Sequence, residues 1–498
     1  MLYRGYPGRA AVVCFEKEVM ILEHETPESI LNPNRWKIMR VTVFLAFMSS
    51  LDGSIVNIAL PNLSETMNEP ISSITWVVTS YLIALCALIP FFGRLGDIKG
   101  NTQIFKFGIA VFTFGSLLCG VSVNLTMLVI SRLIQAIGAA AGMSTNQGII
   151  TRAFPPNERG RALGFNATSV AMGALLGPPL GGFIISVLSW HFLFLINLPI
   201  GLAVFLFSRR ILLKDKGSNE SLDVKGFVLF TLSAILIFGA IGSGENVQFS
   251  NPLVLAAIIA GLVLVAAFII VERKQSQPML DLSMFRSSMF SISIICAVLV
   301  YASMSSINLL QAFYLQNARG MGSFLAGLIL MIYPVVLGAM APLAGYLSDK
   351  IGTKIPTLVG LCISSVGYIV AAFMTLETSL VLTAAVYIIL GVGNALFQSP
   401  NTALIMSSVP NNKLGVAGSV NAFARNTGMV FGVLLATMSL FAAMSARYGQ
   451  PVNDYVEGRP DLFIYGMRFA YLVVAGVCFL GALLTALRLF GFNKKEDL

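Results

Sequence analysis

The chain has 498 residues, of which 56% are hydrophobic and only 11% are charged, and its mean hydropathy is +0.82. A soluble domain carries about 25% charged residues, so this composition excludes a soluble globular protein. The formal net charge is +9, but the basic residues follow the loops between apolar runs and form no patch, which excludes a nucleic-acid partner. We therefore expect a polytopic membrane protein. Its spans should be helices, because apolar runs of about 20 residues are too long for barrel strands.

The sequence lacks the residue patterns of metal centres and nucleotide-binding loops. The six cysteines contain no CxxC pair, and the two histidines, His24 and His191, are far apart, so we expect no metal site and no disulfide framework. The absence of GxxxxGK[ST] excludes ATP binding by a P-loop. We expect no enzymatic activity. Active transport would then draw on an ion gradient or on a separate ATPase subunit.

Residues 1–35 are mixed and polar and lack an apolar core followed by a cleavage site, so we predict a cytosolic tail and not a signal peptide. Fourteen apolar runs follow, each long enough to span a membrane as a helix. They lie at about 38–60, 74–93, 104–123, 126–149, 163–187, 191–208, 225–243, 252–271, 290–315, 324–347, 356–375, 380–400, 415–443 and 464–487.

The distribution of basic residues predicts the orientation of these spans. If the N-terminus is cytosolic, two of the 32 basic residues lie within spans and only four lie in outward loops. Cytosolic loops carry an excess of Lys and Arg, so this orientation obeys the positive-inside rule and places both termini in the cytosol. The two span residues are Arg132 and Arg425, and the four outward ones are Arg319, Arg447, Arg459 and Arg468.

The chain also contains an internal repeat. A segment with glycine, aspartate and glycine at the same spacing follows the second span and again the tenth. We infer two related halves, spans 1–6 and 9–14, with spans 7–8 inserted between them and a substrate site where the halves meet. The repeated residues are Gly93, Asp97 and Gly100, and then Gly345, Asp349 with Lys350, and Gly352.

This arrangement predicts five segments. They are a cytosolic tail at 1–35, an N-terminal six-helix bundle at 36–210, two inserted helices with flanking cytosolic loops at 211–288, a C-terminal six-helix bundle at 289–490, and a cytosolic tail at 491–498.

Asp52 is the only acidic residue well within an apolar run. A carboxylate in hydrocarbon costs roughly 2.5–3.5 kcal/mol on insertion scales, so an intramembrane acid is a functional-site hypothesis. Arg132 has a similar predicted depth and is a possible partner. Burial disfavours the charged form of a carboxyl group and a nearby arginine favours it, so a conformational change could load or release a proton. The alternatives are a cation-binding carboxylate and a fixed ion pair that only holds helices together.

Other polar residues within the spans have both functional and structural interpretations. Arg132, with Gln135 one turn on, could orient a proton pathway or attract an anion, or could bond to backbone carbonyls. Arg425, flanked by Asn421 and Asn426, could line the C-terminal part of a cavity. Interhelical hydrogen bonding would explain the same three residues.

Two further groups of residues suggest moving parts. Small residues let helices approach closely and proline removes a backbone hydrogen bond, so a span with both could form a mobile or leak-proof contact, or merely pack tightly. These residues are Gly173, Gly177, Pro178, Gly181 and Gly182. Asp97 and Asp349, beside short basic loops, are predicted to pair with a helix end or an arginine and latch the cytosolic side, or to lie in plain solvated turns.

At these motifs residues 36–490 resemble the major facilitator superfamily, in particular its fourteen-span drug/proton antiporter branch. Residues 51–61 resemble the first-helix signature of that branch, 93–100 the loop 2–3 motif, and 132–136 the fourth-helix motif linked to proton transfer. Residues 173–182 match the fifth-helix antiporter motif, and 197–201 also resemble this branch. The resemblance implies an all-α fold that exports lipophilic, often cationic, compounds in exchange for protons, without a cofactor.

Three functions remain open at this point. The first is a proton-coupled multidrug exporter, and the second is a specific exporter or importer of a metabolite or organic anion. The third is a membrane sensor or scaffold, whose expected mark, a long soluble domain, the short loops do not provide. We expect a monomer in a bacterial plasma membrane whose partners are a small molecule, protons and the bilayer.

Overall fold

The computed structural model describes residues 34–212, 215, 223–247, 251–275, 282–409 and 414–491. The predicted tails, 1–35 and 491–498, lie outside these ranges except for residues 34, 35 and 491. All regular structure in the described ranges is helical. Fourteen helices are long and apolar enough to cross a membrane, which confirms the predicted class and the number of spans.

Each helix extends beyond its apolar run at one end or at both, because a helix continues past the hydrocarbon as long as its backbone bonds are made. The first, α2, has 33 residues, which is about 50 Å at 1.5 Å per residue, well beyond the ~30 Å hydrocarbon core. The N-terminal half contains α2 (Arg35–Met67), α3 (Ile71–Ile74), α4 (Trp76–Lys99), α5 (Asn101–Gly120), α6 (Leu125–Ala153), α7 (Pro156–Val187), α8 (Phe192–Leu195) and α9 (Asn197–Ile211).

Two helices separate the halves, α10 (Val224–Val247) and α11 (Pro252–Glu272). The C-terminal half contains the 3-10 turn η2 (Leu282–Arg286), α12 (Ser288–Phe313), the π-helical turn η3 (Tyr314–Ala318), α13 (Ser323–Leu330), α14 (Ile332–Ile351), α15 (Lys354–Ala372), α16 (Leu380–Ser407), α17 (Leu414–Tyr448) and α18 (Pro460–Gly491).

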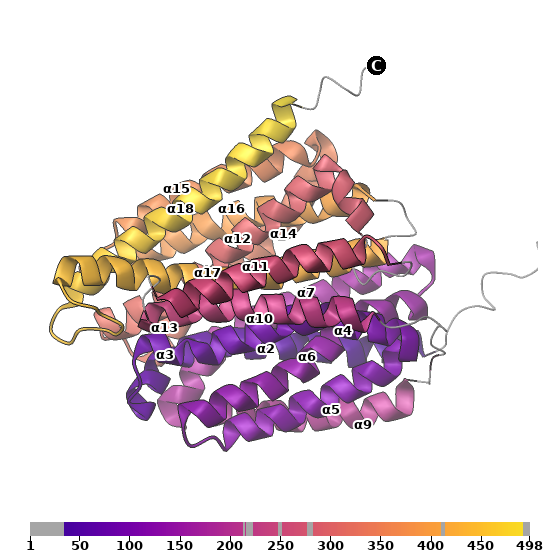
Figure 1. Cartoon of the computed structure of the whole chain (residues 1–498), viewed down its shortest axis with the longest axis horizontal. Coiled ribbons are helices and arrows are strands. Elements are labelled where there is room, and N and C mark those ends of the chain that lie inside the picture. Colours follow the sequence, from indigo (N-terminus) through magenta and orange to yellow (C-terminus); the bar gives the residue numbers. More distant parts are fainter. Residues whose placement is uncertain are drawn as a thin grey trace, which may run out of the picture.

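The two halves lie side by side with their helices roughly parallel to one axis (Figure 1). The N-terminal half, in indigo and purple, and most of the C-terminal half, in orange and yellow, occupy opposite sides of the molecule. Helix α2 begins and α18 ends at the same end, which we call the terminal end. We call the opposite end the far end. It contains the loops 68–70, 121–124, 188–191, 319–322 and 449–459.

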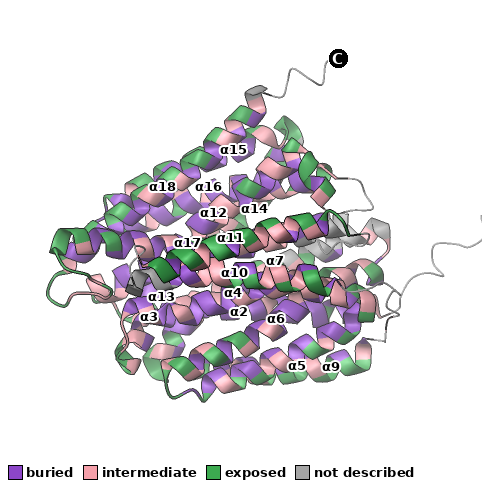
Figure 2. Cartoon of the chain, viewed as in Figure 1, coloured by how far each residue is buried: buried purple, intermediate pink, exposed green. Residues whose placement is uncertain are grey.

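The inserted helices are the most exposed part of the bundle (Figure 2). Only 22% of the α10 span and 17% of the α11 span is buried, against 78% of the span Ile71–Lys99, so both inserted helices face lipid. Helix α10 covers one line of contact between the halves. Its Phe227 ring lies 4.1 Å from Phe91 of α4, and its Phe230 ring lies 5.3 Å from Phe423 of α17.

The halves are joined by hydrogen bonds at the far end. Gln316 of η3 donates to the Ile58 carbonyl of α2 at 2.9 Å. The Ile71 N–H donates to Asp454 Oδ1 at 3.2 Å, and the Ser72 N–H to the Asn453 carbonyl at 3.3 Å. These bonds tie the first and second spans to the C-terminal half at one end of the molecule.

Close helix contact seals the opposite line of contact between the halves. A Cβ atom on Gly182 of α7 would lie 2.9 Å from the Cα of Phe324 in α13, closer than real Cβ contacts allow. A Cβ on Gly327 of α13 would collide with the Pro178 carbonyl in the same way. The glycines therefore let α7 and α13 touch through their backbones, and the far end is closed between them.

We predict that Gly138→Ala destabilises the N-terminal half. A Cβ there would lie 2.6 Å from the Phe112 Cα, so α5 and α6 would have to separate. Overpacking costs about 1–3 kcal/mol. The control is Gly476→Ala in α18, where the new Cβ meets nothing within 4 Å and replacing a helical glycine gains about 0.5–1 kcal/mol. Thermal unfolding in detergent should show a lower midpoint for Gly138→Ala alone. Equal midpoints for the two variants would contradict the packing described.

Candidate functional site

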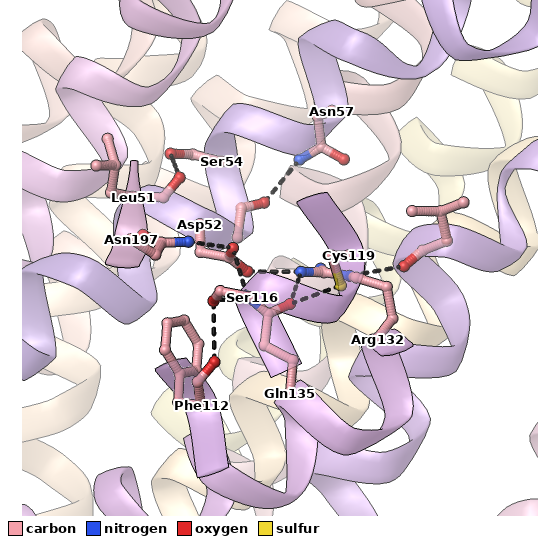
Figure 3. Close-up of polar contacts among 12 residues, drawn as sticks. Leu51, Asp52, Ser54, Asn57, Phe112, Ser116, Cys119, Arg132, Gln135 and Asn197 are labelled. Atoms are coloured by element: carbon pink, nitrogen blue, oxygen red, sulfur yellow. Dashed lines mark hydrogen bonds and ion pairs between the residues drawn. The ribbon is translucent and has the colours of Figure 1, made fainter. Parts of the chain in front are cut away.

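The carboxylate of Asp52 lies inside the N-terminal half, where three side chains donate hydrogen bonds to it (Figure 3). Arg132 of α6 reaches Oδ2 at 2.6 Å. Gln135 of α6 and Asn197 of α9 both reach Oδ1 at 2.9 Å. The ion pair is sealed from solvent, with side-chain exposures of 1% for Arg132 and 0% for Asp52.

A second set of contacts fixes the arginine and the glutamine. Arg132 donates through Nε to the Val77 carbonyl at 3.1 Å and through Nη1 to Gln135 Oε1 at 2.6 Å. Its guanidinium lies 4.0 Å from the centre of the Tyr81 ring, a cation–π contact. Gln135 Nε2 also donates to Ser116 Oγ at 2.8 Å. The network therefore joins α2, α4, α5, α6 and α9.

Burying this ion pair costs free energy, and only full hydrogen bonding around it can offset that cost. Taking two charges out of water is expensive, and the mutual attraction compensates only when the remaining donors and acceptors are satisfied. Here the carboxylate accepts three bonds and the guanidinium contacts an amide, a carbonyl and a ring. Any change at the carboxyl therefore reaches five helices.

Three of the six residues predicted for proton coupling or substrate binding meet here, namely Asp52, Arg132 and Gln135. The other three lie on α17 and join no described contact of the network. Asn426 donates to the Ala422 carbonyl of its own helix at 2.8 Å. Asn421 and Arg425 are partly buried, and Arg425 is close enough to Tyr301 of α12 for an electrostatic interaction.

Two residues with clear structural roles were missed as site residues. Asn197 belongs to residues 197–201, which resemble the antiporter branch named in the sequence analysis, but no spacing rule connects Asn197 to Asp52. Arg488, near the end of the last span, was counted with the cytosolic residues. It is buried in the C-terminal half and donates to Ser293 Oγ at 2.8 Å and Thr357 Oγ1 at 3.2 Å. The depth of a long side chain near a helix end cannot be read from the apolar run.

The predicted latch after α4 is linked to other elements at the terminal end. Asp97 lies 4.0 Å from Arg152 of α6. Arg152 also pairs with Asp215 at 3.2 Å, and Asp215 accepts a bond from the Thr102 N–H at the start of α5 at 3.1 Å. Asp215 thus caps α5 from the segment that leads to α10, a contact the sequence did not predict.

Two glycines of the predicted latch follow the ends of helices, and two lie within helices. Gly100 follows α4 at φ +98°, and Gly352 follows α14 at φ +80°, values that favour glycine. Gly93 and Gly345 lie within α4 and α14, where their Cβ positions would face Ser144 and Ser399. In the second copy Lys350 lies over the Tyr346 ring at 4.7 Å, and the side chain of Asp349 lies outside the described residues.

The antiporter-motif residues of α7 lie along α2 and then along α13. Gly173 and Gly177 face α2, where Ser54 Oγ donates to the Gly173 carbonyl at 3.2 Å. Gly181 also faces α2, at Ile55 and Ile58. Pro178 and Gly182 form the far-end contact with α13 described above. One helix therefore connects the Asp52 helix to the C-terminal half.

Two helical halves with fourteen spans in all, the first half enclosing a buried ion pair, have the architecture of a membrane transporter. The family model described as Major Facilitator Superfamily matches residues 42–433 and 294–496. The chain belongs to the major facilitator superfamily, and it is a multi-pass protein of the cell membrane.

The names of its relatives refer to different substrates. The chain is 33% identical over 467 residues to "Riboflavin transporter RibZ" of Clostridioides difficile (strain 630), covering 93% of this chain and 98% of the relative. It is 29% identical over 403 residues to "Multidrug resistance protein Stp" of Mycobacterium tuberculosis (strain ATCC 25618 / H37Rv), covering 80% of this chain and 75% of the relative. These relatives support the family and leave the substrate open.

A solved structure has the same fold. It is a bacterial homologue of the human lysosomal transporter Spinster in an inward-facing, unoccupied conformation. The match has a TM-score of 0.65 with 15% sequence identity, and it covers 92% of this chain and 97% of the other. At this identity the likeness concerns the fold alone.

We predict that the stability costs of removing the two charges of the buried pair are not additive. Asp52→Asn or Arg132→Gln alone should cost about 3–5 kcal/mol, because an uncompensated buried charge or unsatisfied donors remain. The double variant Asp52→Asn with Arg132→Gln should cost less than the sum of the two. Thermal or denaturant unfolding in detergent measures this coupling. Additive effects would show that the two side chains do not act as a pair.

Proposed function

We propose that this protein is a proton-coupled secondary transporter that exports lipophilic small molecules, cations among them, by alternating access. The observation that carries the proposal is the Asp52–Arg132 pair, sealed within the N-terminal half and held by Gln135 and Asn197. A carboxyl group in this position can exist with or without its proton. Each form places different demands on the helices around it.

The energy available from this switch is large enough to drive a conformational change. Neutralising Asp52 while Arg132 stays charged leaves an uncompensated buried cation, which costs about 3–5 kcal/mol unless the surroundings rearrange. At about 1.4 kcal/mol per tenfold change, this corresponds to a shift of about a hundred- to several-thousand-fold in a two-state equilibrium. Proton loading can therefore select a different arrangement of the two halves.

The contacts between the halves define one of the two states that such a mechanism needs, the one closed at the far end. The far end is closed by the α7–α13 glycine contact and by hydrogen bonds from Gln316, Ile71 and Ser72. With both termini in the cytosol, as the basic residues predict, this end is the outside. Opening it requires α7 and α13 to part, and α7 also packs along the Asp52 helix.

A second candidate function is transport of a specific metabolite. Two observations favour it. The relative named as a riboflavin transporter matches 98% of its own length. Asp52 is also the only carboxylate deep within the described spans, and its oxygens are occupied by Arg132, Gln135 and Asn197. A cationic substrate could pair with it only after the network opens, whereas a neutral or anionic substrate would not need this carboxylate.

We predict that Asp52→Asn abolishes proton coupling. In proteoliposomes with an imposed pH gradient, transport by the variant should fall to the rate measured without a gradient, because an amide cannot carry the proton. The matched control is Asp461→Asn, which removes an exposed far-end carboxylate paired with Arg459 and should leave the gradient response unchanged. A full gradient response in Asp52→Asn, at equal amounts of folded protein, would remove Asp52 from the mechanism.

The substrate candidates separate in the same vesicles. Lipophilic cations, riboflavin and small organic anions are supplied one at a time to the wild-type protein under the gradient. Proton-driven movement of several unrelated cations supports multidrug export, and movement of riboflavin alone supports the metabolite function. If none of these compounds responds to the gradient, proton-coupled transport of these classes is wrong.

We predict that linking α4 to α17 stops transport. Cys86 Sγ of α4 lies 3.7 Å from Thr427 Oγ1 of α17, so Thr427→Cys should form a disulfide across the two halves after a modest shift. Oxidation should block transport and reduction should restore it, because alternating access requires this contact to change. The control Cys86→Ser with Thr427→Cys has no partner thiol at this place. Undiminished transport by the oxidised, fully linked variant would contradict movement at this contact.

A further inference from the structure

Asn197 is the first residue of α9 and holds Asp52 in an unusual way. Its side chain is buried, and Nδ2 donates to Asp52 Oδ1 at 2.9 Å. Its other polar atom, Oδ1, is also buried and has no hydrogen-bond partner among the residues that the structure describes. Buried polar atoms are normally paired. An unpaired acceptor on the same amide that donates to Asp52 therefore requires an explanation.

Of the three side chains that hold Asp52, only Asn197 has an acceptor to spare. The guanidinium of Arg132 contains donors only. The amide of Gln135 is fully used, because Oε1 accepts from Arg132 at 2.6 Å and from Cys119 at 3.8 Å, while Nε2 donates to Asp52 and to Ser116. A proton on Asp52 would therefore meet donors on every side unless one of these groups turned.

We propose that Asn197 is a positioning residue that turns over its side-chain amide to accept the proton-bearing oxygen of Asp52. This rests on the proposed proton coupling. A hydronium ion gives its proton to Asp52 Oδ1, where an O–H bond forms; the O–H bond that breaks leaves its electron pair on the oxygen of the released water molecule. Half a turn about the Cβ–Cγ bond of Asn197 then places Oδ1 where Nδ2 was, within hydrogen-bond distance of the new hydroxyl.

The rearranged network satisfies the protonated acid. Asp52 Oδ2 still accepts from Arg132, and Oδ1 still accepts from Gln135 while its hydrogen is donated to Asn197. In both states a single amide atom of Asn197 is without a partner, so the turn replaces one orphan by another and adds none. The donor-acceptor character of Asn197 thus matches either form of the carboxyl, which Leu, Ala or any other apolar residue could not do.

The titratable groups around the carboxyl come from three neighbouring helices. Arg132 lies on α6, Tyr81 on α4 and Cys119 on α5, and all three interact electrostatically with Asp52. In the described structure α7, α8 and α9 add no charged side chain to this cluster. Asn197 is thus the neutral member of the network that can answer a change of charge by changing which atom it presents.

The position of Asn197 links the turn of its amide to the placement of α9 in the N-terminal half. It directly follows Ile196, where α8 ends and α9 begins. Pro199 has no N–H, so the bond it would have made to the Leu195 carbonyl, four residues earlier, is missing. One backbone hydrogen bond is thus missing where α8 meets α9, next to Asn197, so α9 can adjust its angle against α2 and α5 when Asp52 changes its charge.

The test is infrared difference spectroscopy of the full-length protein in lipid, recorded between alkaline and acidic buffer. The wild type should show a carboxylic acid band that Asp52→Asn removes, together with a change in a side-chain amide band. Asn197→Leu should abolish the amide change and shift the Asp52 acid band, because the hydroxyl has lost its acceptor. In proteoliposomes Asn197→Leu should also lose most of the response to a pH gradient.

Asn401→Leu is the matched control. Asn401 of α16 is also buried and donates from Nδ2 to the Ser293 carbonyl at 3.0 Å. Like Asn197 it has an Oδ1 without a partner among the described residues, but it makes no described hydrogen bond to a carboxylate. It should leave the acid band and the amide change as in the wild type. An Asp52 acid band accompanied by an amide change that persists in Asn197→Leu would overturn the role of Asn197 alone. Absence of any Asp52 acid band would overturn the proposed proton coupling itself.

Discussion

The structure of the N-terminal half depends on one pair of opposite charges held away from water. Asp52 and Arg132 are 2.6 Å apart and both are sealed, so neither charge could remain there without the other and without the hydrogen bonds that surround them. The surrounding groups come from α4, α5, α6 and α9, and they converge on a point within the first span. A membrane interior makes such a cluster costly and therefore informative.

The pair is connected to the contact between the halves through the helix beside it. Helix α7 lies along α2 by way of Gly173 and Gly177 and reaches α13 through Pro178 and Gly182. The small residues that allow close packing near Asp52 thus continue into the residues that close the far end. In the mechanism that we propose, a change in charge at Asp52 would act through α2 on α7, a helix that is already part of this closure.

Composition and the lengths of the apolar runs were enough to predict the class and the fourteen spans, and they made an Asp52–Arg132 pair a possibility. Asp52 and Arg132 could be matched because each was a lone charge in an apolar run and their depths agreed. Asn197 could not be found in this way, because an uncharged amide in a span is unremarkable until its neighbours are known. Arg488 escaped for a related reason, since a long side chain near a helix end can point into the protein or out of the membrane. Asp215 caps α5 across a gap of more than a hundred residues, and no local pattern marks such a contact.

The central claim is that Asp52 exchanges its proton when substrate is bound. The most direct measurement is proton release from purified protein in lightly buffered detergent solution on addition of a compound that the vesicle assay shows to be transported. The account predicts proton release from the wild type and none from an Asp52→Asn variant that still binds the compound. Equal release from both proteins would contradict it.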